Sequence, residues 1–320
     1  MVFGRRGPDE GCSLVDRLVP AKKGKPLRVG GQAVIEGVMM RSPNSMAVAV
    51  RKPNGEIVVK QERLSFFSEK HLLSKAPLVR GVITLLSALV LGIRALNFSA
   101  NQALSDAEGE KEPSPWTMGL TFTVALCFGI FLFFLIPLFL TRWMRFAIPM
   151  LSESGLLFNL VDGTIRMGIF LAYLWSISFF KEIRRVFQYH GAEHKSIFAF
   201  ESGEELVIDR VKGFSYLHPR CGTSFLLIVM VVSILVFALI PHHLAFGYKV
   251  ASRVVLIPLI AGLSYEIIRF ADRKRGSRGI QYIIKPGLWL QRLTAREPSE
   301  AQIEVALHAL QAVLELEERR

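Results

Sequence analysis

Two histidines with helical spacing are the strongest candidates for chemistry in this 320-residue chain. His190 and His194 stand at positions i and i+4, with Glu193 between them, so on a helix the three side chains share one face. His-x-x-Glu-His is the inverted order of the zincin motif, in which two imidazoles hold Zn²⁺ and the glutamate acts on a metal-bound water. We therefore predict zinc ligands at His190 and His194 and a catalytic base at Glu193.

A second group of candidate ligands follows at residues 217–223, directly before an apolar segment. A catalytic zinc usually has three protein ligands and a water, whereas a structural zinc has four protein ligands. His218 or Cys221 could complete either set, and Arg220 could stabilise negative charge on a substrate oxygen. Three nearby carboxylates are alternative ligands: Glu201, Glu204 and Glu205.

The competing interpretation is that these polar side chains hold no metal. Histidine is common at membrane interfaces, Glu193 could pair with Lys195 or Arg220, and Cys221 could be a small packed residue. Three imidazoles and a thiol nevertheless fall within residues 190–221, out of seven His and three Cys in the whole chain. This concentration favours the metal site.

A glycine-rich segment, residues 30–43, contains only two charged residues, Glu36 and Arg41. Its paired glycines, Gly30 and Gly31, allow another segment to approach the backbone closely. Glu36 and Arg41 could clamp a substrate, or the carboxylate could reach the metal. A structural ion pair is an equal alternative. Neither Walker nor dinucleotide-binding spacing is present, so a phosphate-binding loop is not supported.

Three motifs together resemble those of the YqhQ-like family of bacterial multi-pass membrane proteins. They are GGQAVIEGVMMR at 30–41, YHGAEHK at 189–195 and LHPRCGTSF at 217–225. The resemblance covers nearly all of the chain from Gly30 to the C-terminal helix. It implies an uncharacterised, predicted metal-dependent protein, and by position its suspected metal-site residues are His190, Glu193, His194, His218 and Cys221.

Long apolar runs must position these clusters. Apolar residues make up 51% of the chain, and residues 117–140 contain no charge over a length sufficient to cross a bilayer as a helix. Three further spans are predicted at about 164–180, 223–240 and 250–270. The element at 78–104 differs, because only 13 uncharged residues separate Arg80 from Arg94. We predict an interfacial or re-entrant helix there.

The distribution of Lys and Arg predicts the orientation in the cell membrane. Basic residues are frequent in the 181–222 loop and after residue 270, and sparse in the loops at 141–163 and 241–249. The positive-inside rule therefore places both termini and the 181–222 loop in the cytoplasm. The net charge of 39 − 27 = +12 follows from such a topology and does not identify a partner.

The segments outside the membrane domain at 117–270 have distinct compositions. Residues 1–28 are predicted to be a flexible basic tail. Residues 29–77 contain β-prone runs on both sides of Asn54-Gly55, which predicts a small β-hairpin unit. Residues 271–320 include an amphipathic helix at about 300–318, where Ser299 and Gln302 fit a capping box.

The predicted fold class is an α-helical polytopic membrane protein with about four transmembrane helices, one interfacial or re-entrant helix and a small cytoplasmic β-hairpin unit. The first functional hypothesis is a metal-dependent hydrolase with a cytoplasm-facing zinc site, in which Glu193 is the base and Arg220 or Arg41 stabilises the oxyanion. Its partners would be membrane lipids and an unknown protein or peptide substrate, and a homo-oligomer stays open.

The alternative is a non-enzymatic scaffold or assembly factor with a structural metal site. Its basic cytoplasmic face would bind anionic lipid or ribosomal RNA, because a surplus of Lys and Arg attracts any polyanion. The number of protein ligands separates the two hypotheses: three ligands and a water indicate catalysis, and a closed set of four that includes Cys221 indicates structure.

Overall fold

The computed structural model describes residues 27–64, 76–104, 115–219, 221–241, 244–274 and 278–319. The chain divides into two compact units, which we describe separately. The sheet unit comprises Met1–Ser65, Val186–His218 and Ala295–Arg320, and the helical unit comprises Phe66–Arg185 and Pro219–Thr294. The predicted flexible tail at 1–28 lies almost wholly outside the described residues.

The sheet unit is built on a four-stranded antiparallel meander in the order β1-β2-β3-β4. The predicted hairpin is confirmed: β3 and β4 pair across a turn in which Gly55 has φ +88°, a conformation that favours glycine. The first two strands were not predicted, because their short apolar runs are interrupted by glycine and charge. The strands are β1 (Gly30–Val34), β2 (Gly37–Arg41), β3 (Ser45–Arg51) and β4 (Ile57–Arg63).

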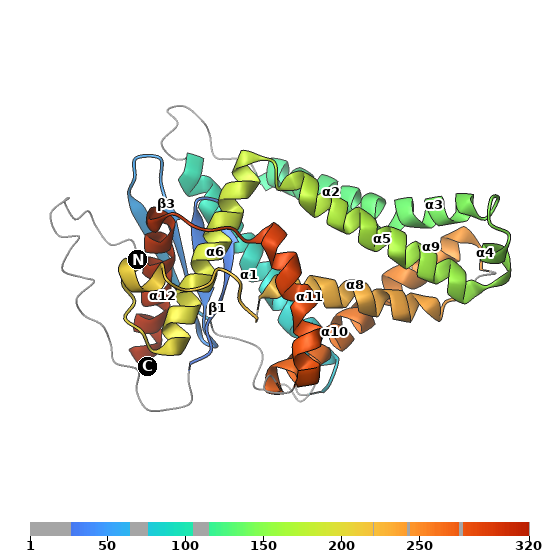
Figure 1. Cartoon of the computed structure of the whole chain (residues 1–320). Coiled ribbons are helices and arrows are strands. Elements are labelled where there is room, and N and C mark those ends of the chain that lie inside the picture. The colour runs from blue at the N-terminus through green and yellow to red at the C-terminus, as the bar shows by residue number, and fades with distance from the viewer. Residues whose placement is uncertain are drawn as a thin grey trace. The chain divides into compact units, whose positions relative to one another are not determined.

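Helices complete the core of the sheet unit. Helices α6 (Lys181–Ser202) and α12 (Glu300–Glu318) lie against the sheet (Figure 1). Alternate residues of β2 and β3 form a buried apolar cluster with side chains from these two helices. The short helix α7 (Ile208–Val211) contributes Val211 to the same cluster. The predicted capping box of α12 is confirmed, since Ser299 Oγ accepts the Gln302 N–H and the Gln302 side chain accepts the Ser299 N–H.

The C-terminal turn of α12 is tied to the β2–β3 turn through Glu317. Its carboxylate accepts hydrogen bonds from the hydroxyls of Ser42 and Ser45, at 2.5 and 3.1 Å, and from the backbone and side-chain nitrogens of Asn44, each at 3.2 Å. Burial alone raises the pKa of Glu317, but these hydrogen bonds outweigh it and hold the pKa below its ordinary value. The carboxylate therefore stabilises the sheet unit in its ionised form.

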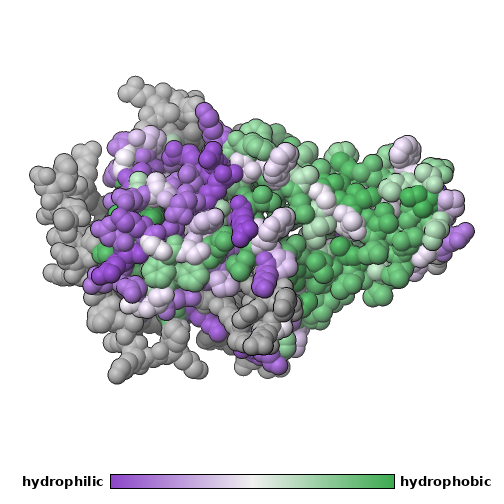
Figure 2. All heavy atoms as spheres, in the orientation of Figure 1, coloured by the Kyte–Doolittle hydropathy of each residue, from purple (hydrophilic) through white to green (hydrophobic). Residues whose placement is uncertain are grey.

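The helical unit exposes an extensive apolar surface, as Figure 2 shows in green over α2, α3, α5 and α8. Its exposed side chains include Trp116, Phe139 and Leu239, which are 88%, 64% and 83% exposed. Apolar surface of this extent is typical of a face in contact with lipid or protein. The helices are α1 (Val79–Leu104), α2 (Pro115–Ile130), the π-helical turn η2 (Phe131–Leu135), α3 (Ile136–Met144), α4 (Met150–Glu153), α5 (Gly155–Ile177), α8 (Gly222–Ala238), α9 (Phe246–Val255), α10 (Ile257–Arg273) and α11 (Arg278–Thr294).

Three helices in the described part of the chain are long and apolar enough to cross a membrane: Val79–Ala103, Gly119–Met144 and Gly155–Ile177. A fourth is counted if Gly247–Val255 and Ile257–Ala271 form one span. The coarse prediction is thus confirmed: the protein is mostly helical, with three or four candidate spans and a small antiparallel sheet.

Two predicted segments differ in detail. The predicted fourth span is bent by 40° between α9 and α10, because Pro258 at the start of α10 cannot donate a backbone hydrogen bond and its ring clashes with the preceding turn. The segment predicted to be interfacial or re-entrant is one continuous helix of 26 residues, since α1 extends ten residues beyond Arg94. It is long enough to cross, and its location stays a prediction.

Glycines allow close helix packing in the helical unit. A Cβ at Gly163 of α5 would lie 2.4 Å from Ile234 of α8, and one at Gly287 of α11 would lie 2.4 Å from the Ser224 hydroxyl. Between α1 and α10, Arg80 pairs with Glu266, the Nε–Oε1 distance being 2.6 Å. The positive charge of Arg80, which suggested an interfacial helix, is thus balanced by the single negative charge of Glu266 in the same unit.

Candidate metal centre

Helix α6 presents the His-x-x-Glu-His motif on one face. The ring centroids of His190 and His194 lie 4.3 Å apart, and their ligand nitrogens lie within 4.8 Å of each other. The predicted helical placement is therefore correct, because α6 continues without a break from Lys181 to Ser202. His194 is buried, whereas His190 is partly exposed.

The ring of His194 is oriented by a backbone carbonyl. Its Nδ1 lies 2.6 Å from the carbonyl oxygen of Tyr216, and a carbonyl can only accept, so Nδ1 carries the proton. In the neutral ring this arrangement leaves the lone pair on Nε2, which is buried. Histidines that bind metals are held in the same way, with one ring nitrogen donating to a carbonyl or carboxylate.

His218 joins the two histidines of α6 from the loop after α7. Its ring centroid lies 5.7 Å from that of His194 and 4.3 Å from that of Phe198, against which it packs edge to face. Its Nε2 lies 3.6 Å from a carboxylate oxygen of Glu201, one of the three alternative carboxylates named above. Three imidazoles and the Glu201 carboxylate of the sheet unit therefore form one group.

Glu193 is the buried acid of the group, with 5% of its surface exposed. Its carboxyl accepts the backbone N–H of Gly31, and its Oε2 has no hydrogen-bond donor among the described residues. Burial raises the pKa of Glu193 to about 7, although the nearby His190 and the Gly31 hydrogen bond both act in the opposite direction. Near neutral pH this carboxyl exchanges its proton readily, as a general base must.

Two glycines allow the surrounding segments to approach α6. A Cβ at Gly31 would lie 2.8 Å from the side chain of Glu193, and one at Gly191 would lie 1.9 Å from the carbonyl oxygen of Arg296. The 295–298 segment is further fixed to α6 by the Arg296 N–H, which donates to the Phe187 carbonyl at 2.9 Å. The motif at 30–41 is therefore part of the Glu193 environment.

Lys195 is a buried cation on α6, only 3% exposed. Its ammonium contacts Glu297 at 2.5 Å and the carbonyl oxygen of Lys212 at 2.7 Å. The pairing of Lys195 with Glu193, which was one of the two pairings considered in the metal-free interpretation, is replaced by these contacts. Glu193 consequently has no cationic Lys195 partner to hold it ionised.

Glu36 and Arg41 stand at opposite ends of β2, about 16 Å apart at roughly 3.3 Å per residue. That separation is too long for an ion pair between them. Glu36 has a positive φ of 52° in the β1–β2 turn, and its carboxylate accepts the Tyr189 hydroxyl at 3.3 Å. Arg41 pairs in register with Gly30, next to the glycine that contacts Glu193, and burial lowers its pKa.

The two remaining predicted residues are Arg220 and Cys221. Arg220 lies outside the described residues. Cys221 belongs to the helical unit, where it caps α8 and its sulfur accepts the Thr223 N–H at 3.3 Å. Their roles stay predictions.

The close approach predicted at the paired glycines is confirmed at Gly31, although its partner Glu193 was not predicted. Two residues of the site were not assigned from the sequence: Tyr189 and Tyr216. Tyr216 acts through its main-chain carbonyl, so its side-chain identity carried no signal. Tyr189 had a signal, because a tyrosine directly before a candidate ligand has a hydroxyl that needs a partner when it is buried.

Comparison with known proteins agrees with the motif pattern. Residues 76–316 match the family described as "Protein of unknown function (DUF1385)". The chain belongs to this family. The chain is also similar to "Uncharacterized protein YqhQ" of Bacillus subtilis (strain 168), with 33% identity over 303 residues, which span 91% of this chain and 94% of that protein. No solved structure matches the chain.

Proposed function

We propose that this DUF1385 protein is a metal-dependent hydrolase whose zinc site lies in the sheet unit, with His190, His194 and His218 as ligands. The observation that carries the proposal is the His194 ring, whose Nδ1 proton is held by the Tyr216 carbonyl while its Nε2 remains a lone-pair donor beside two further imidazoles. A set of three histidines is the donor set of a catalytic zinc.

The chemistry of the donors fits zinc better than a hard cation such as magnesium. Imidazole nitrogen suits Zn²⁺, whereas Mg²⁺ prefers carboxylate, carbonyl and water oxygens. Glu201 could orient His218 as a second-shell carboxylate or replace it as a ligand. Cys221 follows His218 by three residues, so its Cα lies within about 11 Å of the His218 Cα by chain length alone. It remains the candidate for a fourth ligand.

A zinc ion held by these residues would act as a Lewis acid and lower the pKa of a coordinated water to about 7. Glu193 would take the proton, and three observations support this role: it is adjacent to His194, it is buried, and its Oε2 has no hydrogen-bond donor among the described residues. The hydrogen bond from the Gly31 N–H to the Glu193 carboxyl fixes the orientation of that carboxyl. Arg41, or Arg220, would stabilise the negative charge of the substrate oxygen.

The location we propose is the cell membrane, with the helical unit embedded and both termini in the cytoplasm. The apolar helices and their exposed Trp, Phe and Leu side chains support insertion, and the basic loops support the orientation. A zinc site in the sheet unit would then act on a peptide or a lipid headgroup at the cytoplasmic surface.

The test is the zinc content of the full-length, detergent-purified protein, measured by elemental mass spectrometry. We expect one zinc per chain in the wild type, loss of zinc in His190→Ala, His194→Ala and His218→Ala, and retention in Glu193→Gln. His308→Ala is the matched control, because His308 is another partly buried histidine of the sheet unit, on α12, and its charged neighbours are Glu304 and Arg51. Circular dichroism establishes that each variant is folded.

The outcomes separate the two functions. Wild-type protein without zinc after supplementation, although folded, would contradict the hydrolase proposal. Loss of zinc in Cys221→Ala as well as in the histidine variants would indicate a closed four-ligand site, which favours the structural role of a scaffold. Retention in Cys221→Ala leaves an open position for water and favours catalysis.

A further inference from the structure

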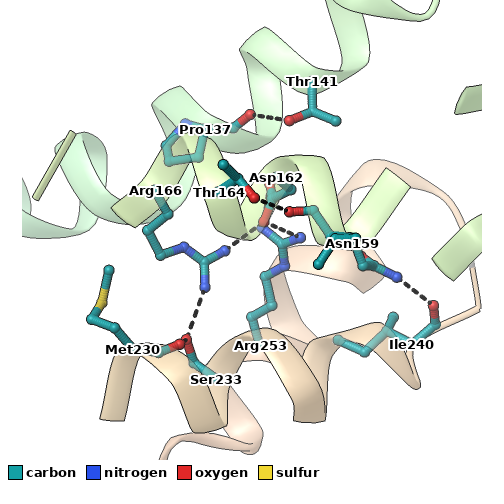
Figure 3. Close-up of polar contacts among 11 residues, drawn as sticks. Pro137, Thr141, Asn159, Asp162, Thr164, Arg166, Met230, Ser233, Ile240 and Arg253 are labelled. Atoms are coloured by element: carbon teal, nitrogen blue, oxygen red, sulfur yellow. Dashed lines mark hydrogen bonds and ion pairs between the residues drawn. The ribbon is translucent and has the colours of Figure 1, made fainter. Parts of the chain in front are cut away.

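The helical unit contains a buried ion cluster in which two arginines share one acid. Both carboxylate oxygens of Asp162 in α5 contact guanidinium nitrogens of Arg253 in α9, at 3.1 and 2.9 Å (Figure 3). One of the same oxygens also accepts a hydrogen bond from Arg166 of α5, at 2.7 Å. All three are 1–2% exposed. Arginine cannot lose its proton in a protein, so the three side chains carry a permanent net charge of +1 whenever Asp162 is ionised.

The cluster also has hydrogen-bond donors without acceptors. The Nε–H groups of Arg166 and Arg253 are buried and have no partner among the described residues. Arg166 reaches the Ser233 hydroxyl only at 3.5 Å. Asp162 is the sole acid within ion-pair distance of either arginine in the described part of the chain. Two unsatisfied donors and a surplus positive charge are the features that favour binding of an anion.

Aromatic contacts stabilise the arginines without removing this requirement. Phe237 of α8 lies beneath both guanidinium groups, with ring centroids 4.9 and 5.2 Å away, and Phe134 lies 5.4 Å from Arg166. A ring face attracts a cation but provides no acceptor for the in-plane Nε–H. The aromatic contacts therefore orient both forks and leave donors for an oxyanion.

Further cationic side chains lie near the N-terminal end of α5, one turn from the cluster. Phe158, one turn before Asp162, contacts the buried Lys249 ammonium at 4.6 Å and the Arg145 guanidinium at 5.9 Å. Asp162 lies seven residues from the first residue of α5, which is about 10 Å along the helix. The cationic side chains thus extend from the helix end to the buried pair.

We propose that Arg166 and Arg253 form a binding site for one phosphate-class oxyanion, supplied either as the headgroup of an anionic lipid or as free phosphate. Paired guanidinium groups provide the bidentate geometry that phosphate oxygens accept. Asp162 holds the two guanidinium groups together. Its negative charge offsets one of their two positive charges, which limits the affinity for the oxyanion. The lipid source rests on the proposed insertion of the helical unit in the membrane, whereas the anion site does not.

The experiment compares anion responses of full-length variants with opposite expected signs. Thermal unfolding is followed in detergent with added inorganic phosphate, against chloride at equal ionic strength, and lipid retention is measured by native mass spectrometry after exposure to phosphatidylglycerol or phosphatidylcholine. Asp162→Asn increases the net charge of the cluster by one, so we expect it to bind the oxyanion about tenfold more tightly or better. Arg253→Gln neutralises the cluster, and we expect it to lose the response.

Arg80→Gln is the matched control, because Arg80 belongs to a one-to-one ion pair with Glu266 in the same unit. We expect it to respond like the wild type. Arg253→Lys keeps the charge but removes the fork, so it should bind more weakly than the wild type even if Asp162→Asn does not fold.

Each outcome is decisive for the site. Retention of phosphatidylglycerol by the wild type, reduced in Arg253→Lys, supports the lipid source, and a phosphate-specific stabilisation without lipid retention supports the free anion. Equal responses in the wild type, Arg253→Gln, Arg253→Lys and Arg80→Gln would overturn the proposal, as would a folded Asp162→Asn without increased binding. These experiments measure anion and lipid binding and not zinc content. Failure of the anion site can therefore be distinguished from failure of the hydrolase proposal.

Discussion

Each unit contains one buried polar cluster, and the two clusters differ in chemistry. In the sheet unit the cluster consists of imidazoles and the Glu193 carboxyl, whose pKa burial raises to about 7. In the helical unit it consists of two arginines, which keep their charge, and a single aspartate between them. The first arrangement suits proton transfer and metal binding, and the second suits a fixed anion. The difference shows that burial alone does not identify a function, because the side-chain chemistry decides what can relieve the buried charge.

The largest effect is expected from removing the acid that the two arginines share. Asp162→Ala leaves two unpaired buried guanidinium groups, and we expect it to lower the free energy of unfolding by about 3–5 kcal/mol. Arg253→Leu leaves the balanced pair of Arg166 and Asp162, so its loss should be less than about half as large. Urea denaturation in detergent measures both. Equal losses would contradict the two-to-one charge balance.

The second prediction concerns the titratable acid of the sheet unit. A folded-state pKa raised from 4.5 to about 7 means that the native state binds the Glu193 proton more tightly, so wild-type stability falls as pH rises from 4.5 to 7 and is constant above. In metal-free protein, Glu193→Gln should therefore be more stable than the wild type by up to ~3 kcal/mol above pH 7, and no more stable below pH 4.5.

Hydrogen exchange of the α6 amides, measured with a chelator present, tests this pH dependence. Glu201→Gln is the control, since Glu201 is only partly buried and its substitution should not reproduce the change in slope. A constant difference between Glu193→Gln and the wild type from pH 4 to pH 8 would show that the carboxyl is not neutralised by burial.

A smaller effect is expected from filling the close approach between β1 and α6. In Gly31→Ala the new Cβ would lie 2.7 Å from the Met39 carbonyl oxygen and 2.8 Å from the Glu193 side chain. We expect a loss of about 1–3 kcal/mol in the free energy of unfolding, with weaker zinc retention because Glu193 and α6 must shift. Gly30→Ala is the control, because its Cβ would meet nothing within 4 Å. Equal behaviour of the two variants would refute the contact.

The smallest effect is expected from weakening the hydrogen bonds by which Glu317 of α12 holds the β2–β3 turn. The pKa of Glu317 is lowered, so its contribution to stability is present above the ordinary value of 4.5 and is lost as pH falls through the lower folded-state pKa. Glu317→Gln should lower stability by about 1 kcal/mol at neutral pH, because the carboxylate is partly exposed and solvent weakens its hydrogen bonds. Hydrogen exchange of α12 in the wild type and in Glu317→Gln should show the difference at pH 7, and the difference should shrink as the pH is lowered below 4.5.

Local patterns predicted much of the architecture. Asn54-Gly55 between β-prone runs predicted the β3–β4 hairpin, Ser299 with Gln302 predicted the start of α12, and the uncharged run at 117–140 predicted a long apolar helix. Each of these features depends on residues close together in the chain. The bend at Leu256 and the first two strands were missed, because Pro258 was placed within a span and the 30–41 segment was interpreted from its glycines and its two charges rather than from its short apolar runs.

The sequence by itself determined the helical face that carries His190, Glu193 and His194, since a period of 3.6 residues places i, i+3 and i+4 together. Only the tertiary structure brought Gly31, Tyr216 and His218 to that face, because each is distant in sequence and two of them act through backbone atoms. Likewise no local pattern joins Asp162 to Arg253, which are 91 residues apart. Helix packing brings this carboxylate to an arginine of another helix, and only the tertiary structure determines which residues far apart in the chain come into contact.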